Sequence, residues 1–568
     1  KNGIKTSYGA KIFKLYGRDA VDIISSDPFC LVSDFPRTGF FIADAITQNT
    51  GMPIDEVKRA KGCVMHFLQQ FSDEGNTFVY KNQLILCCEN QFKIQPDVTL
   101  ESIKRLVESG EIVVEKANND TEAVFLKQLH QAEAGIANKI DALLSIPISF
   151  TGLDSGRITL EVLKKLAIKL SSEQLSALEG ILSLRVAVIT GGPGTGKTTL
   201  IKSISALFNA LGKSLCLAAP TGRAARRISE VTGRKAETIH KLLGYNPVNG
   251  LFEKDRDNPV DADALIIDEA SMIDTFLMFH LLKAVHMQSM LILVGDTFQL
   301  PSVGPGNILS DIIKSRKIET FELKKIYRHA KESPIMVNAH KIRKGQPPDL
   351  EKPSDFQDLS EFYFIEQNNP QTVVTTIVDL CVRKIPERFN FDPLDEIQVL
   401  TPMHKGLAGT INLNHMLQEK LNPNKIMIEK MGNTFKLGDK IMHLKNNYQK
   451  DVFNGDIGTI YDIDKNAQIL SVNYYGRIVD YDFTEIEEIS LAYAISVHKS
   501  QGSEYPAVII PIMMQHFVLL QRNLLYTAIT RGRKLVVIIG SKKALLTALK
   551  NDKPQRRLSM LADRLMAS

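Results

Sequence analysis

From about residue 171 onward, short apolar runs alternate with longer segments that have the periodicity of helices. The apolar runs are almost uninterrupted by polar residues, which is typical of strands covered on both faces by helices. Their alternation with helices predicts parallel sheets, and a break after residue 330 predicts two such domains in tandem. Strands are expected at 185–190, 214–219, 264–268, 290–295, 397–402, 507–512 and 534–540.

Two segments interrupt this α/β pattern. Residues 242–262 contain Asn249-Gly250 between apolar residues, which favours the turn of a β-hairpin. Residues 424–490 hold short alternating runs separated by turn residues. This second segment predicts a small β-barrel inserted into the second α/β domain.

Residues 1–150 have mostly helical patterns. Two pieces, 3–17 and 38–47, place a glycine in a tight turn before a helix. Helix-hairpin-helix motifs that grip a DNA phosphate share this pattern with ordinary helical packing, so both readings stay open. Residues 102–126 have the order helix, glycine stop, strand, turn and strand, which is typical of a winged helix.

Composition narrows the class of protein. A chain of 568 residues is too long for one core, so several domains are expected. No apolar stretch reaches the ~18 residues that cross a bilayer, so we expect no membrane span. The net charge of +5 permits an acidic partner without requiring one. The six cysteines form no C-x-x-C pair, which argues against zinc, iron–sulfur and disulfide frameworks and favours a reducing cytoplasm; they are Cys30, Cys63, Cys87, Cys88, Cys216 and Cys381.

The clearest chemical signal is GGPGTGKTT at 191–199. It satisfies G-x-x-x-x-G-K-[ST] between a predicted strand and a predicted helix, as a phosphate-binding loop requires. Its glycines let successive N–H groups face phosphate oxygens, and the helix adds its positive end. Lys197 is expected to neutralise the β- and γ-phosphates, and the Thr198 hydroxyl to complete a Mg²⁺ shell. The expected nucleotide contacts are Gly192, Pro193, Gly194, Thr195, Gly196, Lys197, Thr198 and Thr199.

Further candidates follow the later strands. In ALIIDEASMID, Asp268 is expected to hold Mg²⁺ and Glu269 to orient and deprotonate the attacking water. Gln299, in GDTFQLPSVGPG, is placed to sense the γ-phosphate through hydrogen bonds. Arg328 and Arg531 are candidate arginine fingers, whose planar guanidinium groups stabilise transferring phosphoryl charge.

Ten segments stand in a fixed order along the chain: SSEQLSAL, GGPGTGKTT, LAAPTGRAARR, ETIHKLLG, LIIDEASMID, GDTFQLPSVGPG, LKKIYR, LTPMHKGLAGTINLN, AYAISVHKSQGSEY and YTAITRGRK. This order is the one found in superfamily-1 helicases. The chain resembles the RecD-like family of these helicases, in its stand-alone long form with helix-hairpin-helix repeats ahead of the motor.

This resemblance implies an α/β fold of two tandem RecA-like P-loop motor domains, with ATP and Mg²⁺ as cofactors. It implies that Gln174 contacts the adenine and Glu504 the ribose. It also implies that Arg328 senses the γ-phosphate. The sequence departs from the family pattern at the next position, where His329 replaces the expected glutamine. The residues that would line the single-strand channel are Pro220, Thr221, Arg223, Thr238, His240, His404, His498, Lys499 and Ser500.

The expected domains follow from these assignments. The hairpin at 242–262 resembles the pin that splits a duplex, and 424–490 the Src-homology-like barrel. Because the chain begins at Lys1, close to the first hairpin, we expect part of the N-terminal region to be missing from it. The domains are 1–150 (helical, with helix-hairpin-helix and winged-helix-like units), 151–330 (first motor domain), 331–423 and 491–568 (second motor domain), and 424–490 (barrel).

The resemblance implies an ATP-dependent DNA helicase that moves 5′ to 3′ on single-stranded DNA and unwinds tailed duplexes in DNA repair or recombination. We expect a monomer associated with the nucleoid in a bacterial cytoplasm. The main alternative is the RecD motor subunit of a RecBCD-like nuclease–helicase. A scaffold with an inactive ATPase is disfavoured because Lys197, Glu269 and Arg531 are all present, and a relaxase–helicase because no H-x-H group occurs.

Overall fold

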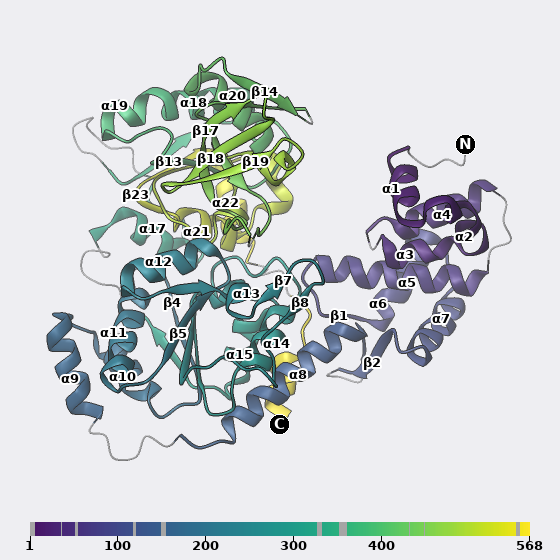
Figure 1. Ribbon diagram of the computed structural model, residues 1–568, viewed down its shortest axis with the longest axis horizontal. Helices are drawn as coiled ribbons and strands as arrows, with labels where there is room; N and C mark the ends of the chain where they lie inside the picture. Colours follow the sequence, from purple (N-terminus) through teal and green to yellow (C-terminus); the bar gives the residue numbers. More distant parts are fainter. Residues whose placement is uncertain are drawn as a thin grey trace.

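The computed structural model describes residues 6–35, 37–50, 55–117, 121–148, 155–325, 332–350, 360–430, 432–447, 449–552 and 557–567. Two parallel sheets lie one above the other in Figure 1, and a mostly helical N-terminal region lies to one side. Within these described ranges, no helix is long and apolar enough to span a membrane.

The first motor domain contains a six-stranded parallel sheet. All four strands predicted between 185 and 295 belong to it, and each residue of its two central strands, Ala264–Ile267 and Met290–Gly295, is buried. The two edge strands were not predicted, because they are short and mix polar with apolar residues. In order across the sheet, the strands are β11 (Thr320–Leu323), β4 (Val186–Gly191), β10 (Met290–Gly295), β9 (Ala264–Ile267), β5 (Leu215–Ala219) and β6 (Ala236–Thr238).

Helices cover both faces of this sheet. Because successive strand residues point to opposite faces, Val186 and Val188 lie in one core and Ala187 and Ile189 in another. The first core includes α8 (Lys127–Leu144), α14 (Thr275–Ala284), α15 (Ile308–Ser315) and α23 (Leu561–Ala567). The second includes α9 (Ser155–Leu166), α10 (Ser172–Ile181), α11 (Lys197–Ala210) and α12 (Gly222–Thr232).

The second motor domain contains a five-stranded parallel sheet. The three strands predicted there are present, and two unpredicted short strands form its edges. The strand order is β12 (Phe362–Glu366), β23 (Gly532–Gly540), β22 (Tyr505–Ile512), β13 (Ile397–Thr401) and β21 (Ala494–Ser496). Its helices include α17 (Pro334–Arg343), α18 (Pro370–Asp379), α19 (Ile385–Phe389), α20 (Thr410–Leu421), α21 (Arg522–Ile529) and α22 (Lys542–Lys550).

Short antiparallel strands fill the segment predicted as an inserted barrel. They form a five-stranded sheet whose buried residues share one core with the second motor domain. Its order is β19 (Arg477–Asp482), β18 (Ile469–Tyr474), β17 (Ile457–Asp464), β16 (Lys440–His443) and β20 (Ile489–Leu491), beside a hairpin of β14 (Met427–Lys430) and β15 (Asn433–Lys436).

The N-terminal region combines tightly packed helices with a small sheet. At Gly39 a β-carbon would lie 1.9 Å from the Leu31 carbonyl oxygen, so only glycine allows α3 and α4 to approach this closely. In the other piece, 3–17, Gly3 lies outside the described residues and Gly17 has φ +61°. The helices here are α1 (Thr6–Tyr16), α2 (Ala20–Ser26), α3 (Leu31–Asp34), α4 (Gly39–Thr50), α5 (Glu56–Asp73), α6 (Lys81–Phe92) and α7 (Pro96–Glu108).

The winged-helix-like order predicted for 102–126 is confirmed. Helix α7 is followed by β2 (Ile112–Lys116) and β3 (Glu122–Leu126), which pair antiparallel, and β1 (Phe78–Tyr80) completes a three-stranded sheet. Residues 118–120, between β2 and β3, are not described.

The predicted hairpin within 242–262 is also present. Strands β7 (Tyr245–Asn246) and β8 (Leu251–Phe252) pair antiparallel beyond α13 (Ile239–Leu242). The loop is four residues long, since Asn246 pairs with Leu251, so Asn249-Gly250 forms its second half and not a two-residue turn. At its tip, Val248 is 94% exposed.

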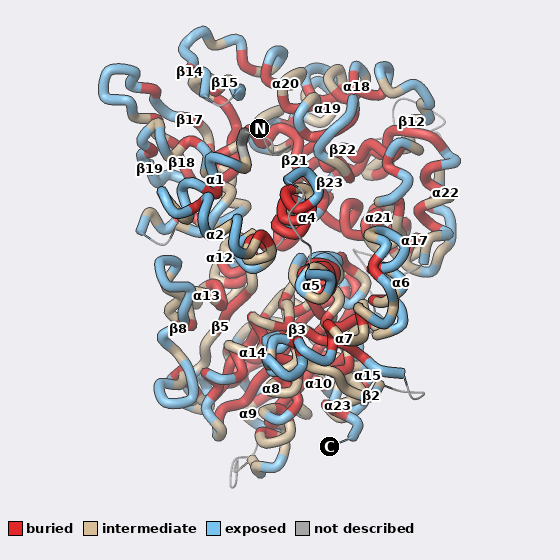
Figure 2. The backbone as a smooth tube through the Cα atoms, turned by 90° about the vertical axis from the view of Figure 1, so that its right-hand side faces the viewer, coloured by how far each residue is buried: buried red, intermediate tan, exposed pale blue. Residues whose placement is uncertain are grey.

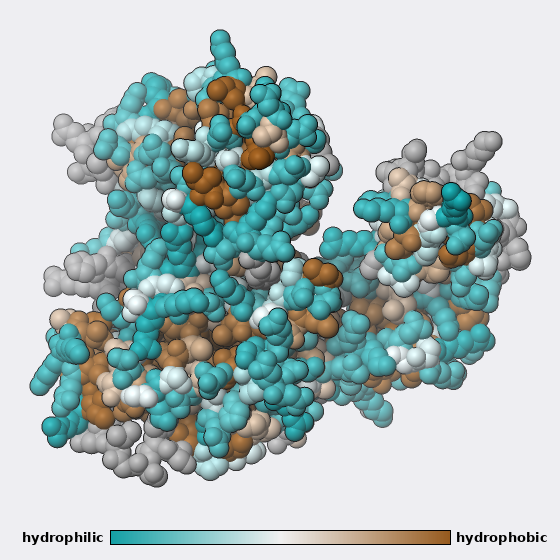
Figure 3. Space-filling model, viewed as in Figure 1, coloured by the Kyte–Doolittle hydropathy of each residue, from teal (hydrophilic) through white to brown (hydrophobic). Residues whose placement is uncertain are grey.

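Two further views show how these parts are arranged. Buried residues concentrate in the two sheets and along α4 and α5 (Figure 2). The surface is hollowed between the N-terminal region and the second motor domain, whereas the N-terminal region joins the first motor domain below (Figure 3).

Candidate nucleotide site and DNA-binding channel

The phosphate-binding loop lies between β4 and α11, as the sequence predicts. Gly194 and Gly196 have φ of +72° and +81°, which turn the backbone back on itself before the helix begins at Lys197. The Lys197 ammonium donates to the carbonyl oxygens of Gly191 and Gly192, at 2.7 and 3.0 Å. The lysine therefore lies inside the loop, next to the start of the helix.

Gln174 supports this loop from behind. Its side chain is fully buried, and its Nε2 donates to the carbonyl oxygens of Thr195 and Gly196 at 3.2 and 3.1 Å. Its Oε1 accepts from the Ser171 N–H, which caps α10. The structure thus gives Gln174 contacts with the loop backbone, and its contact with adenine stays a prediction.

The two predicted catalytic carboxylates follow β9 directly. Burial and the neighbouring Glu269 carboxylate raise the pKa of Asp268 above its ordinary value. Glu269 has φ +51° and ψ +38°, a left-handed conformation that is costly for a residue with a β-carbon. Such conformations cluster at functional sites, where the surrounding structure maintains them.

The sensor loop, residues 295–306, extends from β10 to the second motor domain. Gln299 is 7% exposed, and its Oε1 has no hydrogen-bond partner among the described residues. The next residue, Leu300, is held on both sides by the second domain. Its N–H donates to Thr527 Oγ1 at 2.9 Å, and its carbonyl accepts from Gln501 Nε2 at 2.7 Å.

Three side chains of the second motor domain face the phosphate-binding loop. A β-carbon at Gly192 would lie 3.3 Å from the Tyr526 hydroxyl, 3.4 Å from an Arg343 guanidinium nitrogen and 3.5 Å from the His340 ring. The guanidinium of Arg343 also lies over the ring of Phe298, 4.9 Å from its centre. No sequence motif contains His340 or Arg343, and Tyr526 opens the segment YTAITRGRK without being marked there as a nucleotide contact. The fold brings all three residues to the loop.

The predicted arginine fingers have different outcomes. Arg328 lies outside the described residues. Arg531 is 3% exposed, and it donates to the carbonyl oxygens of Ser503 and Thr527 at 3.1 and 3.2 Å. Arg531 is therefore bonded within its own domain, and its contact with a γ-phosphate stays a prediction.

Glu504, predicted to approach the ribose, binds two arginines. Its carboxylate lies 2.5 Å from Arg227 of the first motor domain and 2.8 Å from Arg533. Burial alone would raise the pKa of Glu504, but these cations hold it below the ordinary value. The ion pair with Arg227 therefore joins the two motor domains.

Arg223, predicted to line the single-strand channel, forms a second bridge between domains. Its guanidinium donates to Ser503 Oγ and to the Tyr505 hydroxyl at 2.8 Å, and to the Tyr475 hydroxyl at 2.9 Å. Arg226 adds a cation–π contact, 4.1 Å from the centre of the Tyr475 ring. The first motor domain, the inserted sheet and the second motor domain meet at these arginines.

Three of the other predicted DNA contacts, Thr238, His404 and Lys499, line two cavities. A cavity of 390 Å³ lies between the first motor domain and the inserted sheet, and Thr238 and Lys241 line it. A cavity of 230 Å³ in the second domain is lined by His404 and Lys499. Pro220 and Thr221 come directly before Gly222 in the sequence, and Gly222 lines the first of these cavities.

Several of the side chains predicted to contact DNA make contacts within the protein. The hydroxyls of Thr221 and Thr238 cap α12 and α13. His240 packs against the hairpin, with its ring centre 5.4 Å from that of Tyr245. The hydroxyl of Ser500 is buried and donates to the Val497 carbonyl at 2.7 Å, whereas His498 is exposed. Direct contacts of these residues with DNA stay predictions.

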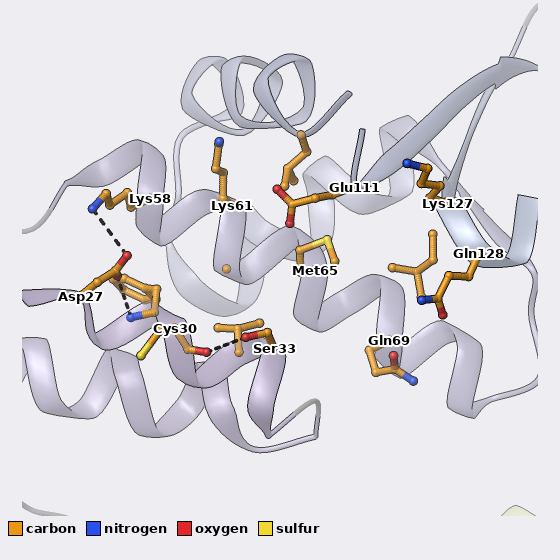
Figure 4. A pocket seen from close by; sticks show the side chains of 15 residues that line it. Asp27, Cys30, Ser33, Lys58, Lys61, Met65, Gln69, Glu111, Lys127 and Gln128 are labelled. Carbon is orange, nitrogen blue, oxygen red and sulfur yellow. Dashed lines mark hydrogen bonds and ion pairs between the residues drawn. The ribbon is translucent and has the colours of Figure 1, made fainter. Parts of the chain in front are cut away.

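A separate cavity of 680 Å³ lies in the N-terminal region (Figure 4). Lys58, Lys61 and Lys127 line it, and Lys58 lies 3.5 Å from Asp27. None of the nucleotide motifs contributes to it. Among the described residues, no group of three His, Cys, Asp or Glu side chains could hold a metal.

The residues at the nucleotide site fit a triphosphate with Mg²⁺. The glycine turns and Lys197 form a cradle of donors, and the buried Gln299 Oε1 remains without a partner among the described residues. The hydroxyl of Thr198 and the carboxylates of Asp268 and Glu269 are the hard oxygen ligands that Mg²⁺ prefers. Asp268 and Glu269 repel each other, and a cation would relieve that repulsion.

Comparisons with known families match most of the chain. The matching family models are the ATP-dependent RecD2 DNA helicase HHH domain (1–78), the AAA domain (169–362), the ATP-dependent RecD-like DNA helicase SH3 domain (413–474) and the UvrD-like helicase C-terminal domain (491–539).

Individual relatives agree with these matches. The ATP-dependent RecD2 DNA helicase of Deinococcus radiodurans is 32% identical over 98% of this chain and 76% of its own. The RecBCD enzyme subunit RecD of Buchnera aphidicola is 31% identical over 64% of this chain and 71% of its own. A solved structure of two Pif1 helicases unwinding forked DNA covers 65% of this chain and 92% of its own, at 22% identity and a TM-score of 0.42. The present chain is 32% identical to the Deinococcus protein over nearly its whole length, which shows that it belongs to the RecD2 family of DNA helicases.

Proposed function

We propose that this protein is an ATP-dependent helicase that moves 5′ to 3′ along single-stranded DNA and separates tailed duplexes in DNA repair or recombination. One observation carries the proposal: Tyr526, Arg343 and His340 of the second motor domain face Gly192 of the phosphate-binding loop. A nucleotide in this loop would therefore contact both domains, and its hydrolysis would change how they fit together.

Each residue at the loop has a role in this proposal. Lys197 and the loop amides hold the phosphates of ATP, and Thr198 and Asp268 hold Mg²⁺. When bound, Mg²⁺ supplies positive charge that neutralises the phosphate oxygens. Glu269 orients a water molecule and accepts its proton, and Gln299 hydrogen-bonds near the reacting phosphate.

The sensor loop transmits the state of the nucleotide. Gln299 is buried, and its Oε1 has no partner among the described residues. The adjacent Leu300 is bound to Thr527 and Gln501 of the second domain. A small displacement of Gln299 therefore moves the contact between domains. A strand bound across both domains would advance with each such change.

The path of the strand follows the two cavities and the bridging arginines. Thr238 and Lys241 line the first cavity, and His404 and Lys499 line the second. Hydroxyl, imidazole and ammonium groups bind phosphate without reading the base sequence. The hairpin of β7 and β8 projects from the first domain with Val248 exposed, as a wedge at a duplex junction would.

The main alternative is a motor subunit of a RecBCD-like enzyme. The match of residues 1–78 to the RecD2 HHH domain favours the stand-alone helicase. The identity over 98% of this chain to a RecD2 helicase, against 64% for a RecD subunit, points the same way. We therefore propose a monomer that acts without RecB and RecC partners.

A strand-displacement assay tests the proposal. The protein, with ATP and Mg²⁺, should separate a duplex with a 5′ single-stranded tail and leave 3′-tailed and blunt duplexes largely paired. Lys197→Ala is the control, since it removes the phosphate contact and should abolish separation of every substrate. Equal unwinding of 3′-tailed substrate would contradict the direction, and no unwinding of any substrate would contradict the helicase assignment.

A further inference from the structure

The chain returns to the first motor domain after completing the second. Helix α22 belongs to the second domain, but residues 557–567, here called the C-terminal strap, lie against α8 and α15 below it (Figure 1). Leu561 and Leu565 are fully buried in the core that contains Ile308 and Ile312 of α15. The strap is therefore a fixed part of the first domain and not a loose tail.

At the start of the strap, Arg557 binds the end of the sensor loop. Its Nη1 donates to Ser302 Oγ at 3.0 Å and to the carbonyl oxygens of Gly304 and Gly306 at 2.9 and 2.7 Å. Its Nη2 donates to the Ser302 carbonyl at 2.5 Å. A planar guanidinium can fix several carbonyl groups at once, whereas a lysine ammonium is a single point charge. Arg557 thus sets the path of residues 302–306.

The same place is joined to the N-terminal region. The Leu558 N–H donates to Asn76 Oδ1 at 2.9 Å, and its carbonyl accepts from the Thr77 N–H at 2.8 Å. The Gly306 N–H donates to the Gly75 carbonyl at 2.9 Å. Sensor loop, strap and the turn between α5 and β1 are therefore hydrogen-bonded to one another.

Gly75 shows how closely these three segments fit. Its φ is +96°, and a β-carbon there would lie 2.3 Å from Arg557 Nε. Any other residue would be strained in its own backbone and would displace the guanidinium. The turn before β1 therefore has a shape that accommodates Arg557.

Burying this cation is costly unless the structure compensates for it. The Arg557 Nε has no hydrogen-bond partner among the described residues. Asp274 and Asp311 attract the charge without the fork-to-fork contact of an ion pair. The carbonyl oxygens of the sensor loop are therefore the main groups that stabilise the buried guanidinium. The position of Arg557 and the conformation of the loop thus depend on each other.

We propose that Arg557 is a positioning residue for the sensor loop. It holds residues 302–306 so that Gln299 stays at the nucleotide cleft, and its neighbour Leu558 links that position to the N-terminal region through Asn76 and Thr77. This inference rests on the proposed ATP-driven function. It adds a residue that none of the nucleotide motifs contains.

The test compares Arg557→Gln with wild type in the full chain. Steady-state hydrolysis of ATP with single-stranded DNA should show kcat reduced about 10-fold or more, with the KM for ATP within about threefold, because misplacement of Gln299 affects the reaction more than nucleotide binding. Arg557→Lys should recover only part of kcat, since it cannot replace the forked contacts.

Arg564→Gln is the matched control. Arg564 is the other arginine of the strap, and it binds Glu115 and Glu133 at 3.0 and 3.3 Å, away from the sensor loop. Its replacement should lower the temperature of unfolding and leave kcat within about twofold of wild type. An equal loss of kcat in both variants, or an unchanged kcat in Arg557→Gln, overturns the proposal.

Two further outcomes are decisive. If Arg557→Gln does not fold, Ser302→Ala removes one bond to the same guanidinium and should lower kcat about two- to fivefold with an unchanged KM; an unchanged kcat then overturns the proposal. If the wild-type protein itself shows no DNA-stimulated hydrolysis, the proposed helicase function fails. This failure is distinguishable from failure of the Arg557 proposal, because it is seen in the wild-type protein without any variant.

Discussion

The hydroxyl of Tyr526 donates a 2.7 Å hydrogen bond to Asp296 Oδ2, joining α21 of the second motor domain to the sensor loop of the first. Asp296 is 2% exposed, and burial raises the pKa of the Tyr526 phenol well above its ordinary value, so the phenol remains a donor. The Tyr526 hydroxyl also lies beside Gly192. One side chain therefore contacts both the sensor loop and the phosphate-binding loop.

Tyr526→Phe should weaken the coupling between DNA binding and hydrolysis. The change leaves Asp296 Oδ2 buried without its partner, at a cost of about 1–3 kcal/mol. We expect DNA-stimulated ATP hydrolysis to fall several-fold while DNA affinity, measured by fluorescence anisotropy, stays close to that of wild type. Tyr493→Phe is the control, since Tyr493 donates a 2.8 Å bond to the buried Asp439 away from the cleft. If both variants lose the same activity, the Tyr526 bond has no special role.

Glu269→Gln should bind nucleotide but not hydrolyse it. The carboxamide keeps the size of the side chain and removes the base, so turnover should fall by roughly 10²–10⁴-fold. Equilibrium binding of a fluorescent ATP analogue should remain within about threefold of wild type, because Lys197 and Asp268 are unchanged. Turnover close to wild type would exclude Glu269 as the base.

Arg343→Gln tests which arginine of the second domain serves the nucleotide. Arg343 lies by Gly192, whereas Arg531 is bonded to Ser503 and Thr527. Removing an arginine from the transferring phosphoryl group costs about 10³–10⁵-fold in turnover. We expect a loss of this size for Arg343→Gln under saturating ATP and DNA. A larger loss in Arg531→Gln, with Arg343→Gln near wild type, would show that the domains close further and bring Arg531 to the phosphate.

Deleting Pro247 and Val248 should separate movement from unwinding. The deletion leaves Asn249-Gly250 as a two-residue turn between Asn246 and Leu251, which this dipeptide favours. DNA-stimulated hydrolysis should persist, since the nucleotide site is untouched. Separation of a 5′-tailed duplex should collapse, because each base-pair step costs about 1.4 kcal/mol of stacking and the wedge is gone. Val248→Ser, which keeps the loop length, is the control, and wild-type unwinding by the deletion variant would make the hairpin a surface loop.

The raised pKa of Asp268 predicts a pH dependence of stability. Between the ordinary value of 3.8 and the raised pKa, the folded protein binds a proton that the unfolded chain has released. The stability of the nucleotide-free protein should therefore decrease as the pH rises through this range. Asp268→Asn should remove that part of the decrease, measured as the difference in unfolding temperature from wild type across the range. A constant difference between the two proteins at every pH would exclude the effect.

The sequence by itself determined the parts of this protein whose contacts are local. The Lys197 ammonium and the Gly191 carbonyl are 6 positions apart, and Thr195 Oγ1 and the Gly192 carbonyl are 3 apart. Glycine turns, strand ends and helix caps of this kind depend on nearby residues, so the phosphate-binding loop and the hairpin were predictable. The central strands were predictable as well, because burial on both faces requires long apolar runs.

Only the tertiary structure decided the contacts between distant segments. Arg557 is 255 positions from Ser302, and Arg223 is 252 from Tyr475. An arginine in the sequence carries no sign of its partner, so the sequence does not show the bonds of Arg223 across the domains and does not single out Arg343 or Arg557; a DNA contact of Arg223 stays a prediction. Their positions follow from how sheets, barrel and strap pack, since packing fixes where a long side chain can reach and which buried groups remain to accept its hydrogen bonds.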